Sequence, residues 1–161
     1  MERILNQHAL IYLAFLSTVF LLDLFTKHLA ESFIKEDIQV LPFLKLVLVY
    51  NKGVAFGLLS DAPDWLRILV LLGVPPIAIV FTFFYTVKSR DWLVSLSMGA
   101  IGGGALGNFY DRLILGEVRD FIYFSYGKFS YPAFNVADSM ISIGIVLFLL
   151  RETLFKRYRL N

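Results

Sequence analysis

Apolar residues along this chain gather into four long stretches, which are separated by segments of mixed polarity. The stretches cover residues 9–29, 66–87, 93–115 and 136–155. An α-helix rises about 1.5 Å per residue, so about 20 apolar residues cross the ~30 Å hydrocarbon core of a bilayer. The pattern therefore predicts four transmembrane helices. Pro75 and Pro76 predict a kink in the second helix.

The first stretch has an alternative interpretation as a cleaved signal peptide. Its apolar region is long, however, and Asp23 interrupts it. It also lacks a clear small-x-small cleavage site, so we expect a transmembrane helix. Asp23 and Lys27 lie four residues apart within this stretch. That spacing predicts a structural ion pair on one helix face.

The segments 30–65 and 116–135 join the predicted helices and have patterns of their own. Residues 41–59 are rich in β-forming residues and are interrupted by Asn-Lys-Gly at 51–53, which predicts strands with a turn at that point. Residues 121–134 place Tyr and Phe around a Gly-Lys pair. This second pattern predicts a hairpin that forms an aromatic belt at the membrane surface.

Composition supports a membrane protein and excludes several kinds of chemistry. The 161 residues are 58% hydrophobic and only 17% charged, with a mean hydropathy of +0.70. A soluble domain of this size could not bury so much apolar surface. The chain has no Cys and two His, which excludes disulfides, thiol catalysis and His-rich metal sites. A net charge of +2 gives no reason to expect a nucleic-acid partner.

Basic residues indicate how the helices are oriented. Four spans place both termini on one side of the membrane, together with the short connection at 88–91. The tail after residue 150 carries Arg151, Lys156, Arg157 and Arg159. Because short cytoplasmic segments are enriched in Lys and Arg, we expect cytoplasmic termini and outward-facing segments at 30–65 and 116–135. We expect one domain and a monomer.

Glycines mark one face of the third stretch. Gly99, Gly103 and Gly107 recur every four residues, which leaves one side of the helix flat. In lipid, a flat face of this kind allows close contact between helix backbones. We therefore expect the third helix to pack closely against a neighbouring helix.

Two Asn-x-x-Asp units stand at the edges of the third and fourth stretches: Asn108 with Asp111, and Asn135 with Asp138. Asp111 lies 18 positions after residue 93, or about 27 Å along a helix, close to the outer boundary of the bilayer. Asp138 belongs to the first turn of the fourth helix on that same side. The two carboxylates are therefore predicted at a similar depth, each near its own Asn.

Paired carboxylates without Cys or His suit two kinds of chemistry. One is a divalent metal site, and the other is an aspartic-protease dyad in which two close acids share one proton. In a dyad the ionised acid activates water while the protonated acid polarises the scissile carbonyl. The residues alone do not choose between these uses. Asp138 by itself also fits a first-turn acid that the helix dipole stabilises.

Three further classes of protein fit parts of this pattern. A transporter with Asp111 and Asp138 as ion ligands would need a polar path through the inner half of the membrane, where the sequence offers only scattered Ser and Thr. A metal-dependent membrane enzyme would need more clustered carboxylates or His. A non-catalytic assembly factor would make no use of the Asn-x-x-Asp units.

Five motifs together resemble the lipoprotein signal peptidase family (signal peptidase II). They are DLFTK (23–27), YNKGVAFGLL (50–59), GGALGNFYDR (103–112), VRDFI (118–122) and FNVADS (134–139). The resemblance implies a four-helix membrane aspartic protease with a small outward-facing β-rich cradle and an outer loop. It implies cleavage of diacylglyceryl-modified bacterial prolipoproteins on the amino side of the lipidated lipobox cysteine. The enzyme would lie in the bacterial inner membrane with its active site at the outer leaflet.

The resemblance also implies roles for particular residues. The catalytic acids would be Asp111 and Asp138. Groups that support the acids or bind the substrate would be Asn51, Asn108, Arg112 and Asn135. Structural support would come from Asp23, Lys27, Gly53 and Asp120. No metal or other cofactor is expected, and partners other than the substrate would be membrane lipid and globomycin-type cyclic peptide inhibitors.

Overall fold

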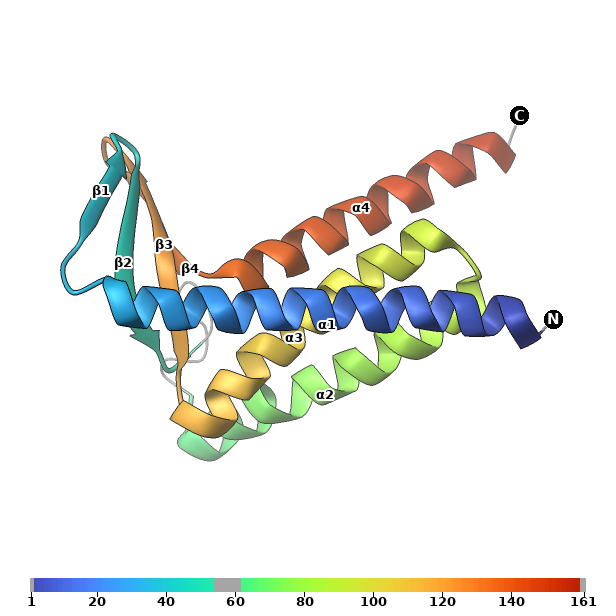
Figure 1. Ribbon diagram of the computed structural model, residues 1–161, viewed down its shortest axis with the longest axis horizontal. Helices are drawn as coiled ribbons and strands as arrows, with labels where there is room; N and C mark the ends of the chain where they lie inside the picture. Colours follow the sequence, from blue (N-terminus) through green and yellow to red (C-terminus); the bar gives the residue numbers. More distant parts are fainter. Residues whose placement is uncertain (1, 54–61, 160–161) are drawn as a thin grey trace.

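The computed structural model describes residues 2–53 and 62–159, which form four helices and a four-stranded antiparallel sheet (Figure 1). The elements in chain order are α1 (Glu2–Phe33), β1 (Ile38–Leu41), β2 (Leu44–Asn51), α2 (Asp64–Ser89), α3 (Trp92–Leu115), β3 (Val118–Tyr126), β4 (Phe129–Phe134) and α4 (Val136–Arg159). The helices form a bundle, and the sheet stands at one end of it. The start of α1 and the end of α4 lie at the opposite end.

Each helix contains the apolar stretch that predicts it and, in most cases, extends a few residues beyond it. Among the described residues, Gln7–Phe33 and Asp64–Ser89 are long and apolar enough to cross a membrane, with mean hydropathies of 2.0 and 2.3. Leu21, Phe25 and Ile77 are large apolar side chains that lie more than half exposed on these two helices. Such surfaces suit contact with acyl chains better than contact with water.

Helix α3 forms the centre of the bundle and contacts α1, α2 and α4. The predicted glycine face is confirmed: Gly99, Gly103 and Gly107 all lie directly against α1. A β-carbon at Gly103 would lie 2.7 Å from the backbone oxygen of Leu16. The absence of side chains on this face therefore sets how closely α1 and α3 approach.

The sheet has the strand order β1-β2-β3-β4. The hairpin predicted around the Gly-Lys pair is confirmed, because β3 and β4 are joined at Gly127, which has a φ of 58° that glycine adopts readily. The Asn-Lys-Gly segment predicted to interrupt the strand lies where β2 ends at Asn51, and the chain bends at residues 52 and 53. β1 and β2 pair through a further turn at 42–43, which the sequence pattern did not predict. A strand predicted after residue 53 lies outside the described residues.

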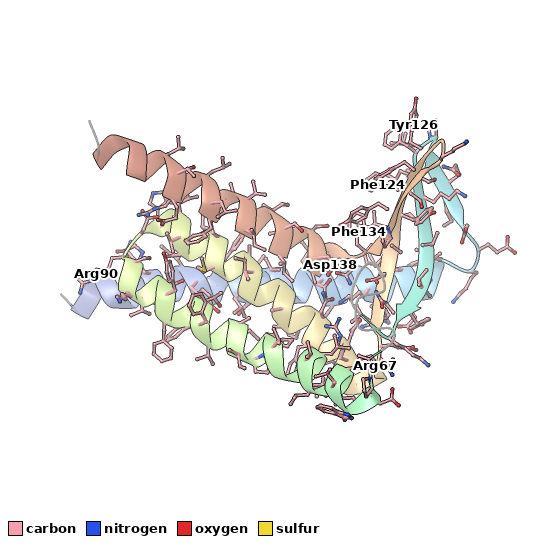
Figure 2. The ribbon with its side chains drawn as sticks, turned by 180° about the vertical axis from the view of Figure 1, so that it is seen from behind. Arg67, Arg90, Phe124, Tyr126, Phe134 and Asp138 are labelled. Atoms are coloured by element: carbon pink, nitrogen blue, oxygen red, sulfur yellow. The ribbon has the colours of Figure 1, made fainter. Side chains whose placement is uncertain are left out.

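Aromatic side chains cover one part of the sheet. The ring of Phe124 stacks on Phe43 and on Phe134, with centroid separations of 6.3 and 5.7 Å. Figure 2 shows Phe124 and Tyr126 on the part of the sheet that projects away from the helices. The predicted contact of this aromatic surface with the membrane remains a prediction.

Gly103→Ala should destabilise the protein. A β-carbon at this position would lie 2.7 Å from both the Leu16 backbone oxygen and the Val19 Cβ, so α1 and α3 would have to separate. Overpacking of this kind costs about 1–3 kcal/mol, which the midpoint of thermal unfolding in detergent would report.

The matched control is Gly73→Ala in α2, where an added β-carbon meets no atom of the described residues within 4 Å. This variant should keep or raise the midpoint, since Ala favours a helix over Gly by about 1 kcal/mol. Equal losses in the two variants would contradict close packing of α1 on α3.

Candidate functional site

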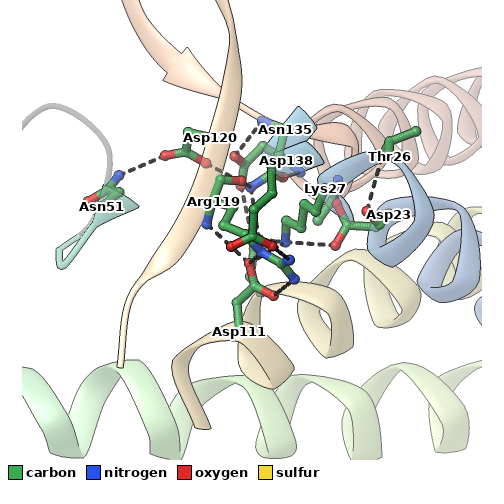
Figure 3. Close-up of polar contacts among 12 residues, drawn as sticks. Asp23, Thr26, Lys27, Asn51, Asp111, Arg119, Asp120, Asn135 and Asp138 are labelled. Carbon is green, nitrogen blue, oxygen red and sulfur yellow. Dashed lines mark hydrogen bonds and ion pairs between the residues drawn. The ribbon is translucent and has the colours of Figure 1, made fainter. Parts of the chain in front are cut away.

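Four charged side chains lie buried together where α1, α3 and β3 meet (Figure 3). Lys27 Nζ lies 2.7 Å from Asp23 Oδ2 and 3.4 Å from Asp111 Oδ2. Arg119 binds the same Asp111 carboxylate through two hydrogen bonds: Nη2 donates to Oδ1 at 2.8 Å, and Nε donates to Oδ2 at 3.2 Å. We call Asp23, Lys27, Asp111 and Arg119 the buried charge cluster. The predicted ion pair between Asp23 and Lys27 is confirmed.

The first turn of α4 is fixed by two carboxylates. Asp23 Oδ1 accepts a hydrogen bond from the backbone N–H of Ala137 at 2.8 Å. Asn135 Oδ1 accepts one from the N–H of Asp138 at 3.0 Å, while the Asp138 carboxylate accepts one from the N–H of Asn135 at 3.2 Å. This reciprocal pair resembles a capping box. It gives the Asn-x-x-Asp spacing at 135–138 a structural reason and holds the Asp138 side chain at the start of α4.

Strand β3 carries two adjacent charged residues that reach different neighbours. Arg119 reaches into the buried charge cluster, and its Nη1 also pairs with Glu31 at 2.9 Å. Asp120 instead contacts neutral amides: Asn135 donates to Oδ1 at 2.7 Å, and Asn51 donates to Oδ2 at 3.1 Å. Successive residues of a strand point to opposite faces. The ion pairs of Arg119 therefore hold β3 in the orientation that presents Asp120 to α4.

Asp120 and Asp138 line one cavity of about 230 Å³, which we call the carboxylate cavity. Asn108 and Arg112 of α3 also line it, as does the part of β4 from Tyr131 to Phe134. Asn108 Nδ2 donates a hydrogen bond to Asp138 Oδ1 at 2.8 Å. Both carboxylates therefore face the same space while neutral amides hold them in place.

Burial raises the pKa of Asp120 to about 7, and the negative charge of Asp138 acts in the same direction. Hydrogen bonds from Asn51 and Asn135 oppose this rise without cancelling it. Asp120 is therefore far more readily protonated near neutral pH than an exposed Asp. Arg119 differs, because its hydrogen bonds to Asp111 raise its pKa and keep the guanidinium charged.

The structure does not support the sequence hypothesis that Asp111 forms the dyad with Asp138. Asp111 is fully buried, is paired with Lys27 and Arg119, and is absent from the described lining of the carboxylate cavity. Two adjacent cations stabilise its ionised form, so it is poorly suited to share a proton. Asp120, expected only to support the outer segment, lies in the cavity with Asp138. This geometry favours Asp120 over Asp111 as the partner of Asp138.

Arg119 was not identified from the sequence as a site residue, although one signal was present. Arg119 and Asp120 form a charged pair within the otherwise apolar VRDFI segment, which becomes the buried part of β3. Charged residues are rarely buried unless they are paired or functional. The pairing partner of Arg119 comes from a different element and could not be read from this segment.

The end of β2 lies next to the carboxylate cavity. Asn51 Oδ1 accepts a hydrogen bond from the N–H of Gly53 at 2.9 Å, and Arg112 Nη2 donates to the Gly53 carbonyl at 3.3 Å. These contacts fit the supporting role expected for Gly53. Because the amide of Asn51 also holds Asp120, its first role in this structure is to orient a carboxylate. Contacts of Asn51 and Arg112 with a substrate remain predictions.

The donor set of the site does not suit a metal ion. Within residues 7–53 and 62–154, whose side chains are described, no three or more His, Cys, Asp or Glu side chains are arranged to hold one. Arg112 lines the cavity beside Asp120 and Asp138. Its positive charge would repel a cation placed between the two carboxylates.

Comparison with known proteins places this arrangement in a family context. The sequence profile of the family described as Signal peptidase (SPase) II matches residues 15–154. The lipoprotein signal peptidase of Aquifex aeolicus (strain VF5) is 55% identical over 151 residues, which cover 94% of this chain and 90% of that protein. The lipoprotein signal peptidase of Sulfurihydrogenibium sp. (strain YO3AOP1) is 45% identical over 162 residues, covering 98% and 99%.

A solved structure supports the fold independently. A bacterial membrane enzyme determined by the in meso method at 2.3 Å resolution superposes with a TM-score of 0.76 and 28% sequence identity. The match covers 90% of this chain and 87% of that one. The helical bundle with its sheet at one end is therefore an architecture that a membrane enzyme uses.

The pKa of Asp120 predicts how stability depends on pH. Its folded-state value of about 7 lies above the ordinary value of 3.8, so the stability that this group contributes is fully present below pH 3.8 and is lost as pH rises through about 7. The interval corresponds to roughly 4 kcal/mol. Asp120→Asn cannot ionise and should therefore flatten the fall in the thermal unfolding midpoint between about pH 4 and 7.

The matched control for this measurement is Asp37→Asn, at an exposed position before β1. This variant should keep the native dependence of the unfolding midpoint on pH. An Asp120→Asn profile that is identical to the native one would show that Asp120 has no raised pKa.

Proposed function

This chain belongs to the signal peptidase II family, and we propose that it removes signal peptides from lipid-modified bacterial prolipoproteins by aspartic catalysis. One observation carries the aspartic assignment. Asp120 and Asp138 face one cavity and receive hydrogen bonds from neutral amides. Membership of the family indicates the substrate class, and the two carboxylates indicate aspartic catalysis.

In the proposed mechanism Asp120 begins as the protonated acid, because burial favours its neutral form, and Asp138 acts as the base. A water molecule gives a proton to Asp138 as its oxygen bonds to the scissile carbonyl carbon. Asp120 gives its proton to the carbonyl oxygen, which produces a neutral gem-diol. Asp138 then protonates the amide nitrogen while Asp120 takes a hydroxyl proton. The carbon–nitrogen bond breaks, and both acids regain their starting states.

Neutral amides around the acids serve this mechanism. Asn51 orients Asp120, Asn108 orients Asp138, and Asn135 contacts both acids. A neutral donor fixes a carboxylate oxygen without adding the positive charge that would keep the group ionised. Arg112 lines the same cavity, and its planar guanidinium suits a backbone carbonyl of an extended peptide.

We further propose that all four helices cross the bacterial inner membrane, with the sheet outside and both termini in the cytoplasm. The exposed apolar side chains of α1 and α2 support the crossing, and the basic residues of the tail support the orientation. The carboxylate cavity then lies at the outer leaflet. A diacylglyceryl group on the cysteine would hold the bond on its amino side at that depth. A globomycin-type cyclic peptide would occupy the same cavity.

Asp120→Asn and Asp138→Asn should each lower cleavage of a lipidated prolipoprotein by about 10²–10⁴-fold, because each removes one half of the acid–base pair. Release of signal peptide by the purified protein in detergent measures this effect. EDTA is included in the assay, and loss of native activity that Mg²⁺ or Zn²⁺ restores would favour a metal-dependent enzyme instead.

Asp111→Asn is the variant that separates the two dyad assignments. It leaves Lys27 and Arg119 buried with less negative charge nearby, so it should lower the unfolding midpoint more than Asp120→Asn does. The folded fraction should retain more cleavage than either dyad variant. Abolished cleavage at native stability in Asp111→Asn, with activity kept within tenfold in Asp120→Asn, would return the catalytic role to Asp111.

The native rate should depend on pH with an alkaline limb near neutrality. Asp120 loses the proton that it gives to the carbonyl oxygen as pH rises through about 7, so kcat/KM should fall over that range. Substrate binding, measured separately at each pH, shows whether the fall belongs to the chemical step. A kcat/KM that stays constant from about pH 6 to 10 would rule out a shared proton with this pKa.

A further inference from the structure

A second cavity, of about 340 Å³, lies at the sheet end of α2 and shares Arg112 with the carboxylate cavity. Its lining includes three cationic side chains from three parts of the chain, namely Lys52, Arg67 and Arg112. None of the described residues that line it is acidic. We call it the cationic cavity.

The positive charge of this cavity is only partly compensated. Arg67 Nη2 pairs with Asp64 Oδ1 at 2.5 Å, but the Asp64 side chain is 82% exposed, so water weakens the pair. Arg112 Nε is buried without a hydrogen-bond partner in the part of the chain that the structure describes. The cavity therefore has unused capacity to bind an anion.

An apolar surface continues from the cations along α2. Ile68, Leu71 and Leu72 line the same cavity and follow Arg67 at spacings that place them on one side of the helix. Ile68 is more than half exposed. Figure 2 shows Arg67 at the sheet end of α2 and Arg90 at the opposite end of the bundle. The cations therefore lie at one end of this apolar surface.

We propose that the cationic cavity binds the phosphate of an anionic phospholipid, whose acyl chain lies along Ile68, Leu71 and Leu72. Arginine binds phosphate oxygens through two parallel N–H groups, which suits Arg67, and Lys52 adds a second positive charge. Basic pockets between transmembrane helices are known to bind anionic head groups. A free phosphate ion would use the cations but leave the apolar surface unoccupied, so the combination of the two favours a lipid.

A Trp at position 68 provides a probe of this cavity, because Ile68 lines it and is more than half exposed. The native Trp65 is absent from the described lining, and residues two apart on a helix do not face the same side. The chain has two Trp, so the probe protein combines Ile68→Trp with Trp65→Phe and Trp92→Phe. This protein is placed in phosphatidylcholine vesicles that contain either brominated phosphatidylglycerol or brominated phosphatidylcholine, and quenching of the fluorescence from position 68 is measured. Phosphatidylglycerol should be preferred by at least about fivefold, the effect of one Lys or Arg near an anionic lipid.

Arg67→Ala and Lys52→Ala, each made in the probe protein, should lower this preference by about fivefold or remove it. Lys128→Ala, at an exposed position between β3 and β4, is the matched control and should keep it. Each variant is compared in both lipids, so a change in the intrinsic fluorescence of the probe does not affect the ratio. An unchanged ratio in Arg67→Ala and Lys52→Ala would overturn the site.

A final measurement separates a lipid from a free anion. Inorganic phosphate, added at constant ionic strength, should leave the phosphatidylglycerol preference unchanged because it lacks an acyl chain. If phosphate removes the preference, the cavity binds free anions and the lipid assignment is wrong. Equal quenching by the two brominated lipids in the otherwise native protein would also overturn it.

Discussion

Asp111 is buried with two cations, and the positions of three elements depend on this ion group. Lys27 comes from α1, Asp111 from α3 and Arg119 from β3. An unpaired buried charge costs several kcal/mol, so each of these side chains requires the others. Strand β3 is consequently fixed to the bundle where Arg119 meets Asp111. Asp120, the next residue of the strand, owes its position to that contact.

The partners of each carboxylate distinguish structural acids from reactive ones. Asp23 and Asp111 both contact the buried cation Lys27, and these ion pairs suit the two acids to hold helices together. Asp120 and Asp138 contact amides, which orient a carboxylate and still allow it to gain or lose a proton. The predicted depth in the membrane is similar for Asp111 and Asp138 and does not distinguish them. Their hydrogen-bonding and ionic partners do.

Local patterns in the sequence account for most of the fold but for only part of the site. Long apolar stretches locate the helices, and the Gly-Lys pair locates the turn at Gly127, because both signals act within a few residues. The Asn-Lys-Gly segment likewise marks the point where β2 ends and the chain bends. The turn at 42–43 that joins β1 to β2 was not predicted. Asp120 and Asp138 line the same cavity because β3 packs against the helical bundle. The periodicity of the sequence does not predict that packing. Asp111 follows Asn108 at the same spacing at which Asp138 follows Asn135. The sequence pattern consequently favoured Asp111 as the partner of Asp138.

Antiparallel pairing makes the tip of the β3–β4 hairpin a suitable place for protein engineering. Ile122 pairs with Phe134, close to both reactive acids in sequence, whereas Gly127 lies at the far end of the hairpin. The separation of the acids is thus set where the strands pair and does not depend on the length of the tip. A fluorescent or soluble fusion partner inserted between the strands would add mass to a small membrane protein without moving the two carboxylates apart.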